Sequence, residues 1–292
     1  MQKKKVIALM YDFDKTLSPK DMQEYGFIQN IGMNPVEFWE EANKICQKSS
    51  MDKILAYMYL MLKAAKKNNV PITRESFMKL GADVKLFPGV KTWFKRINAY
   101  GASLGLEIEH YIISSGLAEI VEGTSIAKEF KKIYACEFHY NASGNADWPQ
   151  QAINYTTKTQ FLFRISKGVL DTLDDDTLNS KMKPQQRRIP YRNMIYFGDG
   201  LTDVPCMKLV KEYGGESIAI YQANKFHKVQ KLIDEERVNY VCPSDYREGS
   251  ELDKIVKQIL QKMALVNELV AIKEELVYER KSPTIVPEEK VM

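Results

Sequence analysis

Five short apolar runs, each of the length of a β-strand, constrain the fold of this 292-residue chain most strongly. They span residues 5–11, 110–114, 193–197, 217–221 and 239–242. Continuous runs of this length, bounded by glycine and aspartate, are typical of parallel strands that are buried on both faces. Helical patterns separate the runs, which predicts an α/β fold with a doubly wound parallel sheet. The carboxyl ends of the strands then share one edge, where ligands bind in open sheets.

Residues 18–86 interrupt this alternation of strands and helices. Asn34 and Pro35 open a helical stretch that runs through Gln47, with Asn34 as the N-cap and Pro35 at the first helical position. Helical patterns also cover 51–67 and 73–80, and no strand pattern occurs. We therefore expect a small helical domain at 18–86, inserted after the first strand between two parts of one core, 1–17 and 87–250. The insertion carries four aromatic residues that either pack in its core, as is more common, or line a pocket: Phe38, Trp39, Tyr57 and Tyr59.

The carboxy-terminal part of the chain has a heptad pattern. Alternating steps of four and three residues separate its apolar positions, which are Leu252, Val256, Ile259, Met263, Val266 and Val270. This stripe predicts a helix over 251–281. This helix either packs on the chain's own core or joins two copies in a homodimer. Packing on the core is favoured, because the stripe is short and Lys273 interrupts its continuation. Residues 282–292 contain two prolines and no apolar pattern, which predicts a disordered tail.

Charge and cysteine usage exclude several classes of function. The net charge of +4 arises from 42 basic and 38 acidic residues, an excess too small to indicate nucleic-acid binding. No apolar stretch is long enough for a membrane span, and no signal peptide is recognisable. The four cysteines form no CxxC pair, and the three histidines are not at zinc-ligand spacing. We therefore expect a cytoplasmic protein with reduced thiols.

Two carboxylates, Asp12 and Asp14, directly follow the first strand. One carboxylate of such a pair can attack phosphorus and form an aspartyl-phosphate. The other can protonate the leaving oxygen and later deprotonate water. Because a carboxylate is repelled by an anionic phosphate, this chemistry needs Mg²⁺ and cationic or N–H donors. The hypothesis therefore requires further acids and a lysine elsewhere in the chain.

Three later segments supply these groups. Asp199 and Asp203 follow the strand at 193–197 in a glycine-containing loop, and such carboxylates suit a hard, oxygen-ligated cation. Ser114, Ser115 and Gly116 follow the apolar residues that end at Ile113, and a hydroxyl with free N–H groups at a strand-to-helix turn suits phosphate oxygens. Lys158 lies at the start of a helical pattern over 157–165.

In order and spacing, these segments resemble the four motifs of the haloacid dehalogenase-like hydrolase superfamily, near its phosphoserine-phosphatase-like branch. The DxDx(T/V) motif matches 12–16, and the apolar strand that ends in serine matches 110–114. The motif lysine matches Lys158, and GDGxxD matches 198–203. The resemblance extends over residues 5–245. It implies a Rossmann-like core and a helical cap at 18–86 that closes over the substrate.

The resemblance also implies roles for the acidic residues. Asp12 would be the nucleophile and Asp14 the general acid and base. The Asp12 carboxylate, the Asp14 backbone carbonyl and Asp199 would hold Mg²⁺. Asp203 would support the metal or orient Lys158.

Further roles concern the phosphoryl group. Ser114 would bind its oxygens, Ser115 and Gly116 would contribute to substrate binding, and Lys158 would balance the charge of the phosphorylated intermediate. Two alternatives stay open. Ser115 replaces Ser114 if the strand register shifts by one residue. Lys167 also resembles the motif lysine, although Lys158 is favoured because it opens the helix.

These interpretations lead to one leading hypothesis and two alternatives. The carboxylate at Asp14 favours cleavage of a phosphate ester, whose leaving group needs a proton. We expect a Mg²⁺-dependent phosphatase that hydrolyses a small phosphorylated metabolite through an aspartyl-phosphate. A phosphotransferase would share the first half-reaction. A non-catalytic binding or regulatory protein on the same fold is disfavoured, because all the motif residues are intact.

Overall fold

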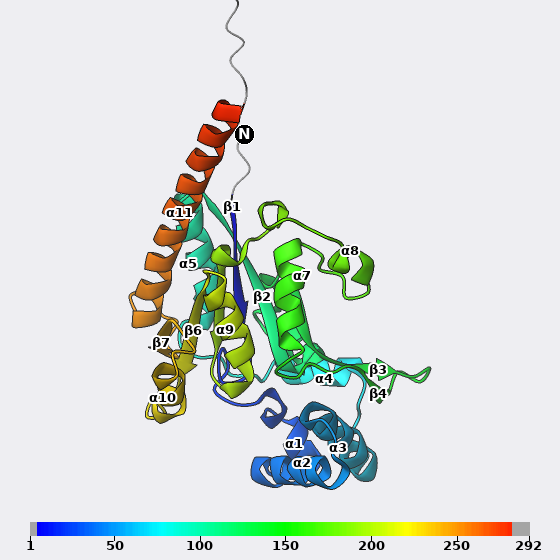
Figure 1. Ribbon diagram of the computed structural model, residues 1–292. Helices are drawn as coiled ribbons and strands as arrows, with labels where there is room; N and C mark the ends of the chain where they lie inside the picture. The colour runs from blue at the N-terminus through cyan, green and yellow to red at the C-terminus, as the bar shows by residue number, and fades with distance from the viewer. Residues whose placement is uncertain (1–4, 282–292) are drawn as a thin grey trace, which may run out of the picture.

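The computed structural model describes residues 5–281, with side chains to residue 277, and is organised around one seven-stranded sheet (Figure 1). The strand order is β4-β3-β2-β1-β5-β6-β7, and every pairing is parallel except that of β3 with β4. The tail predicted for 282–292 lies outside the described residues. The strands are β1 (Lys5–Tyr11), β2 (Leu106–Leu117), β3 (Lys132–Tyr140), β4 (Ala146–Gln151), β5 (Met194–Gly198), β6 (Glu216–Tyr221) and β7 (Tyr240–Pro243).

Helices connect these strands and cover both faces of the sheet. They are α1 (Phe27–Asn30), α2 (Pro35–Ser49), α3 (Lys53–Asn68), α4 (Arg74–Gly81), α5 (Val90–Ser103), α6 (Ala118–Glu122), α7 (Lys158–Lys167), α8 (Asp175–Asn179), α9 (Val204–Glu212), α10 (His227–Asp234) and α11 (Glu251–Lys281). In Figure 1, α7 and α9 lie in front of the sheet and α5 behind it. None of the described helices is both long and apolar enough to cross a membrane.

The predicted α/β fold with a doubly wound sheet is confirmed. Four of the five apolar runs form β1, β5, β6 and β7 to within one residue at each end, and the fifth lies inside the longer β2. A polar stretch at 136–155, with a turn at Ser143, Gly144 and Asn145, predicts only a β-hairpin there, whereas β3 already begins at Lys132. The first half of β3 pairs in parallel with β2, and its second half pairs antiparallel with β4. Only the second half therefore carries a hairpin signal.

Strand β1 lies in the middle of the sheet, and six of its seven residues are buried. Its last residue, Tyr11, is fully buried together with its hydroxyl group. Trp93 Nε1 of α5 donates a hydrogen bond to this hydroxyl at 2.9 Å, and the hydroxyl is also 3.1 Å from His110 Nδ1 of β2. Because a buried hydroxyl without a partner is costly, these bonds fix the end of β1 against its neighbours.

Between β1 and α5 the chain forms the expected helices. Asn34 Oδ1 accepts a hydrogen bond from Glu37 N at 3.0 Å, and the Glu37 side chain caps Asn34 in return, so α2 begins at Pro35. Helices α2 and α3 pack on each other beyond the carboxyl end of β1 (Figure 1). In contrast, α4 packs against α6, and its Phe77 stacks on Phe138 of β3 at a centroid distance of 5.6 Å.

The heptad stripe on α11 packs inward over its first half. Its first four residues, Leu252, Val256, Ile259 and Met263, are buried. The last two are only half-buried. The packed face ends at Asn267, whose side chain donates to Asn193 Oδ1 at 2.9 Å. This stripe therefore contacts the chain's own core.

A buried carboxylate, Glu109 of β2, ties the long loop before β5 to the sheet. It pairs with Arg188 of that loop through two hydrogen bonds, at 2.6 and 2.5 Å, and with Lys131. Tyr111 OH donates to it at 2.6 Å. Burial by itself raises the pKa of Glu109, but these donors outweigh burial and lower it from 4.5 to about 2. The ionised form is thus favoured in the folded state.

We expect the substitution Glu109→Gln to lower the free energy of unfolding by roughly 3 kcal/mol at neutral pH, because two cations lose their partner. The folded-state pKa of Glu109 is depressed, so its contribution is present above 4.5 and disappears as the pH falls towards 2. Urea denaturation of both proteins over a pH series measures this difference. A difference that does not shrink in acid would contradict the assignment.

Candidate functional site

A cavity of about 430 Å³ opens at the carboxyl edge of the sheet. One wall comes from the ends of β1, β2 and β5 and from the start of α7, and the opposite wall comes from α2 and α3. Six of the predicted site residues line it: Asp12, Asp14, Ser114, Ser115, Lys158 and Asp199. Gly116 and Asp203 lie behind this lining and contact it. The topology therefore brings four distant segments to one place.

The ammonium group of Lys158 joins two carboxylates at the floor of the cavity. Its Nζ donates to Asp12 Oδ1 at 2.8 Å and to Asp203 Oδ1 at 2.7 Å, and the lysine is only 1% exposed. Burial by itself lowers the pKa of Lys158, but the charges of Asp12 and Asp203 outweigh burial and raise it. The lysine is therefore charged at neutral pH, and its position is fixed from two sides.

The alternative lysine, Lys167, lies at the other end of α7. Its Nζ donates to the backbone carbonyl groups of Leu178 and Ser180, and it does not line the cavity. Lys158 occupies the cavity because it is the first residue of α7, and that end of the helix faces the carboxyl edge of the sheet. Lys167 instead ties the loop after α7 to its helix.

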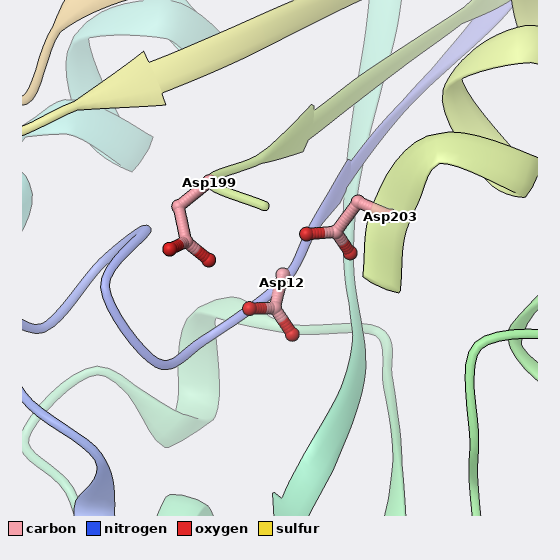
Figure 2. A group of neighbouring side chains, drawn as sticks. All are labelled: Asp12, Asp199 and Asp203. Atoms are coloured by element: carbon pink, nitrogen blue, oxygen red, sulfur yellow. The ribbon is translucent and has the colours of Figure 1, made fainter. Parts of the chain in front are cut away.

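The carboxylates of Asp12, Asp199 and Asp203 form an acidic cluster (Figure 2). Two of them, Asp12 and Asp203, accept the hydrogen bonds of Lys158. One oxygen from each of Asp12, Asp199 and Asp203 lies within 4.8 Å of the others. Burial raises the pKa of Asp12 to about 6, although Lys158 opposes the shift. The pKa of Asp199 is raised well above its usual range by burial and then by the charges of Asp12 and Asp203. The three groups therefore repel one another, and a cation among them would relieve that repulsion.

The donor set in this cluster fits a divalent cation with a preference for oxygen ligands. All three side chains offer carboxylate oxygens, and no cysteine or histidine joins them among the described residues. The second oxygen of Asp203, Oδ2, is buried and has no hydrogen-bond partner in the described part of the chain. Its first oxygen accepts from Tyr196 OH at 2.8 Å as well as from Lys158. Tyr196 was not singled out from the sequence, since it is one of many strand residues.

Gly198 permits the close packing behind this cluster. A Cβ atom at this position would lie 2.5 Å from Asp203 Cγ. Any side chain would therefore push Asp203 away from Lys158 or distort the end of β5. The glycine that opens the loop at 198–203 is thus required for a close approach.

Asp14 lies on the cavity wall beside the cluster. Its Oδ1 accepts a hydrogen bond from the backbone N–H of Met22 at 2.8 Å. Its pKa is raised well above the usual range by burial and then by the charges of Asp21 and Asp12. Asp21 is held nearby because Lys15, which has a positive φ of 60°, turns its side chain onto it at 2.6 Å. Asp21 was missed by sequence reasoning, since no spacing pattern links it to Asp14.

Both candidate serines contribute to the cavity wall. Ser114 is buried, and its Oγ accepts a hydrogen bond from Gly116 N at 3.0 Å, so the hydroxyl proton remains available for another acceptor. The Ser115 carbonyl accepts from Tyr57 OH at 2.7 Å. A Cβ atom on Gly116 would lie 2.1 Å from Met22 Cε and 3.0 Å from Asp14 Oδ2. Gly116 therefore supports the wall by leaving room for Asp14.

The opposite wall carries a mixed set of side chains from α2 and α3. Tyr57 and Trp39 line the cavity and contact each other edge to face at 5.8 Å. Phe38 is fully buried in the core, as expected for one of the two alternatives. Tyr59 fits neither alternative, because it is 46% exposed to solvent and does not line the cavity. Lys53 also lines this wall. It was not predicted, because only the packing of α2 on α3 turns it towards the strand ends.

Comparison with known protein families shows to which family the chain belongs. A model of the haloacid dehalogenase-like hydrolase family matches residues 9–208. An uncharacterized protein of Borreliella burgdorferi is 25% identical over 295 residues, which cover 90% of this chain and 99% of that protein. The matched region contains all four motifs, from Asp12 to Asp203. The family predicted from the motifs is therefore confirmed.

Several solved structures have a fold similar to that of this chain. A HAD family hydrolase from Salmonella enterica serovar Typhi has a TM-score of 0.58 at 15% identity, covering 86% of this chain and 70% of its own. A substrate-bound phosphoserine phosphatase has a TM-score of 0.55 at 16% identity, covering 88% of this chain and 99% of its own. At these identities the similarity concerns the arrangement of the elements.

We expect Mg²⁺ to raise the melting temperature of the protein, because a cation that binds only the folded state stabilises it. In Asp199→Asn this rise should disappear. The fold itself should persist, since Asp199 forms no hydrogen bond or ion pair within the described residues and its loss relieves repulsion. Thermal unfolding with and without Mg²⁺ measures both effects. Asp176→Asn, an exposed change on α8, should keep the full Mg²⁺ response, and an unchanged response in Asp199→Asn would rule out the site.

Proposed function

Because the chain belongs to the haloacid dehalogenase-like hydrolase family, we propose that it is a phosphatase that hydrolyses a small phosphomonoester through an aspartyl-phosphate, with Mg²⁺ as cofactor. One observation carries this proposal. The buried ammonium group of Lys158 joins Asp12 to Asp203 at the floor of a cavity large enough for a metabolite. The fold shared with phosphoserine phosphatases supports it.

In the first half-reaction, an oxygen of Asp12 attacks phosphorus and the bond between phosphorus and the ester oxygen breaks. Asp14 gives its proton to that leaving oxygen. Its raised pKa favours the protonated form that this step requires. Lys158 keeps the attacking carboxylate in place through its 2.8 Å bond and balances the negative charge that gathers on the phosphoryl group.

In the second half-reaction, Asp14 accepts a proton from water, and the water oxygen attacks the phosphorus of the aspartyl-phosphate. The bond to Asp12 breaks, inorganic phosphate leaves, and both carboxyl groups return to their first state. The Ser114 hydroxyl, whose oxygen already accepts from Gly116, can donate to a phosphoryl oxygen in both steps. Ser115 and Gly116 complete this side of the site.

The acidic cluster provides the ligands for the cofactor. The Asp12 and Asp199 carboxylates, with the Asp14 backbone carbonyl, would hold Mg²⁺, which when bound neutralises the repulsion between carboxylate and phosphate. The hydrogen bonds of Asp203 to Lys158 and Tyr196 support the role of orienting the lysine. The oxygen-only donor set supports Mg²⁺ over softer metals.

The insertion at 18–86 would act as the cap of this site. Its helices α2 and α3 form the wall that faces the strand ends, so the leaving group of a bound ester would contact Trp39 and Lys53. In the proposed division of the chain into domains, the remaining parts are the core at 1–17 and 87–250 and the helix at 251–281.

A reducing cytoplasm is the proposed location of the protein, supported by four free thiols at Cys46, Cys136, Cys206 and Cys242.

We expect Asp12→Asn to lower Mg²⁺-dependent phosphate release from p-nitrophenyl phosphate by about 10³-fold or more, because an amide cannot form the phosphoenzyme. Asp83→Asn, an exposed change outside the motifs and outside the cavity lining, is the matched control and should keep full activity. Equal turnover in Asp12→Asn and the control would reject the mechanism. Added alcohols distinguish transfer from hydrolysis, since a phosphotransferase would yield alkyl phosphates.

The cationic side chain of Lys53 leads to a prediction about the leaving group. Two esters that differ by one carboxylate, phosphoserine and phosphoethanolamine, are suitable probes. We expect Lys53→Met to raise KM for phosphoserine by about fivefold, as the loss of an exposed ion pair worth ~1 kcal/mol implies, and to leave KM for phosphoethanolamine unchanged. Equal effects on both esters would show that Lys53 does not contact the carboxylate.

A further inference from the structure

Helix α11 carries a second apolar stripe, which is exposed. Its members are Leu265, Leu269, Ile272 and Leu276, and each is between 46% and 58% exposed. Each residue turns an α-helix by about 100°, so this stripe lies on the face opposite the buried stripe that ends at Met263 and Asn267. One face of α11 therefore closes the core, and the other presents large aliphatic side chains to solvent.

The exposed stripe continues on a part of α11 that the domain does not support. Beyond Asn267 the helix runs on for residues 268–281, and in Figure 1 this orange-to-red end extends past the amino-terminal ends of the strands. From residue 272 to 277 every side chain is exposed. A helical segment of about 14 residues is only marginally stable in water by itself. A partner along the exposed stripe would stabilise it.

We infer that a second copy of this chain covers the stripe, in a parallel two-stranded coiled coil. The steps between the four residues are four, three and four, which is the spacing of a coiled-coil seam. Leu265 and Ile272 take the d positions, and Leu269 and Leu276 take the a positions. The homodimer that the sequence suggested through the stripe at 252–270 needs residues that are buried in the core, so the seam lies on the opposite face.

Charged residues beside the stripe favour pairing with a second copy of this chain, and they favour a parallel over an antiparallel direction of the two helices. Glu268 and Glu275 occupy g positions, and Lys273 occupies an e position. In a parallel pair, a g residue faces the e residue five positions later on the partner, so Glu268 faces Lys273 of the second copy on both sides of the seam. In an antiparallel pair, g residues face each other, and glutamates would repel. All three are exposed and without an ion-pair partner within the described residues.

The geometry of the domain allows this association. Because the buried face of α11 points towards its own sheet, the exposed face points away from it, and two domains would lie on opposite outer sides of the helix pair. The stripe extends over about 16 Å of helix, at a rise of ~1.5 Å per residue. That contact is small for a permanent dimer, so the dimer dissociates on dilution. The catalytic cavity lies at the other edge of the sheet and stays open.

Sedimentation velocity of the full-length protein over a concentration series tests this inference. We expect dimers at high concentration and monomers after dilution. Ile272→Glu places a charge in the seam and should give monomers throughout. Val277→Glu is the matched control, because this exposed residue is next to Leu276 but outside the seam, and it should keep the dimer. Phosphatase activity and helix content by circular dichroism should match the wild type in both variants.

The parallel direction of the two helices can be tested separately. Glu268→Lys should weaken the dimer, and the double change Glu268→Lys with Lys273→Glu should restore it, since the pair is only exchanged. Leu276→Cys should form an intermolecular disulfide under mild oxidation, because the same a position meets itself in a parallel pair. A wild type that stays monomeric at every concentration, or a dimer that survives Ile272→Glu, would overturn the proposal. A dimer that shows neither the disulfide in Leu276→Cys nor rescue by the charge exchange would overturn its parallel direction.

Discussion

The two hydrogen bonds from Lys158 to Asp12 and Asp203 are the contacts on which the rest of the site depends. They bring the start of α7, the end of β1 and the loop after β5 together, although 146 residues separate Asp12 from Lys158. Without this cation, two buried carboxylates would repel each other with no compensation, which a folded protein tolerates poorly. In the proposed mechanism the same bonds hold the nucleophile Asp12 in place, so charge compensation and catalysis would use one arrangement.

The order of the strands makes this arrangement possible. Strands β2, β1 and β5 are neighbours in the sheet, and their carboxyl ends therefore deliver Ser114, Asp12 and Asp199 to one edge. Close approach there needs glycine at two points, since a side chain on Gly198 or Gly116 would collide with the residues behind the cavity. The helices between β1 and α5 then cover that edge with side chains of mixed character, where a leaving group would be recognised.

Much of the fold and of the site was predictable from local patterns. Strands β1 and β5 to β7 follow from continuous apolar runs, and the start of α2 follows from a capping box at Asn34. The motif order was sufficient to indicate the family and the acidic cluster. Less predictable were β3, which changes partner halfway along, and the residues Asp21 and Tyr196. Asp21 acts on Asp14 through its charge, and Tyr196 acts on Asp203 through a hydrogen bond. A periodic pattern along the sequence does not show which distant residues come close together when the elements pack.

The sequence by itself determined which segments are strands and helices and which residue types could carry phosphoryl chemistry, because hydrophobic periodicity and motif spacing are local properties. Tertiary structure decided which of two lysines enters the cavity, since Lys158 and Lys167 lie at opposite ends of one helix and only one end faces the strand edge. It also decided which face of α11 is free. That helix carries two apolar stripes, and burial of one against the sheet leaves the other exposed. Burial depends on what lies across the contact, and this information is not present in the segment itself.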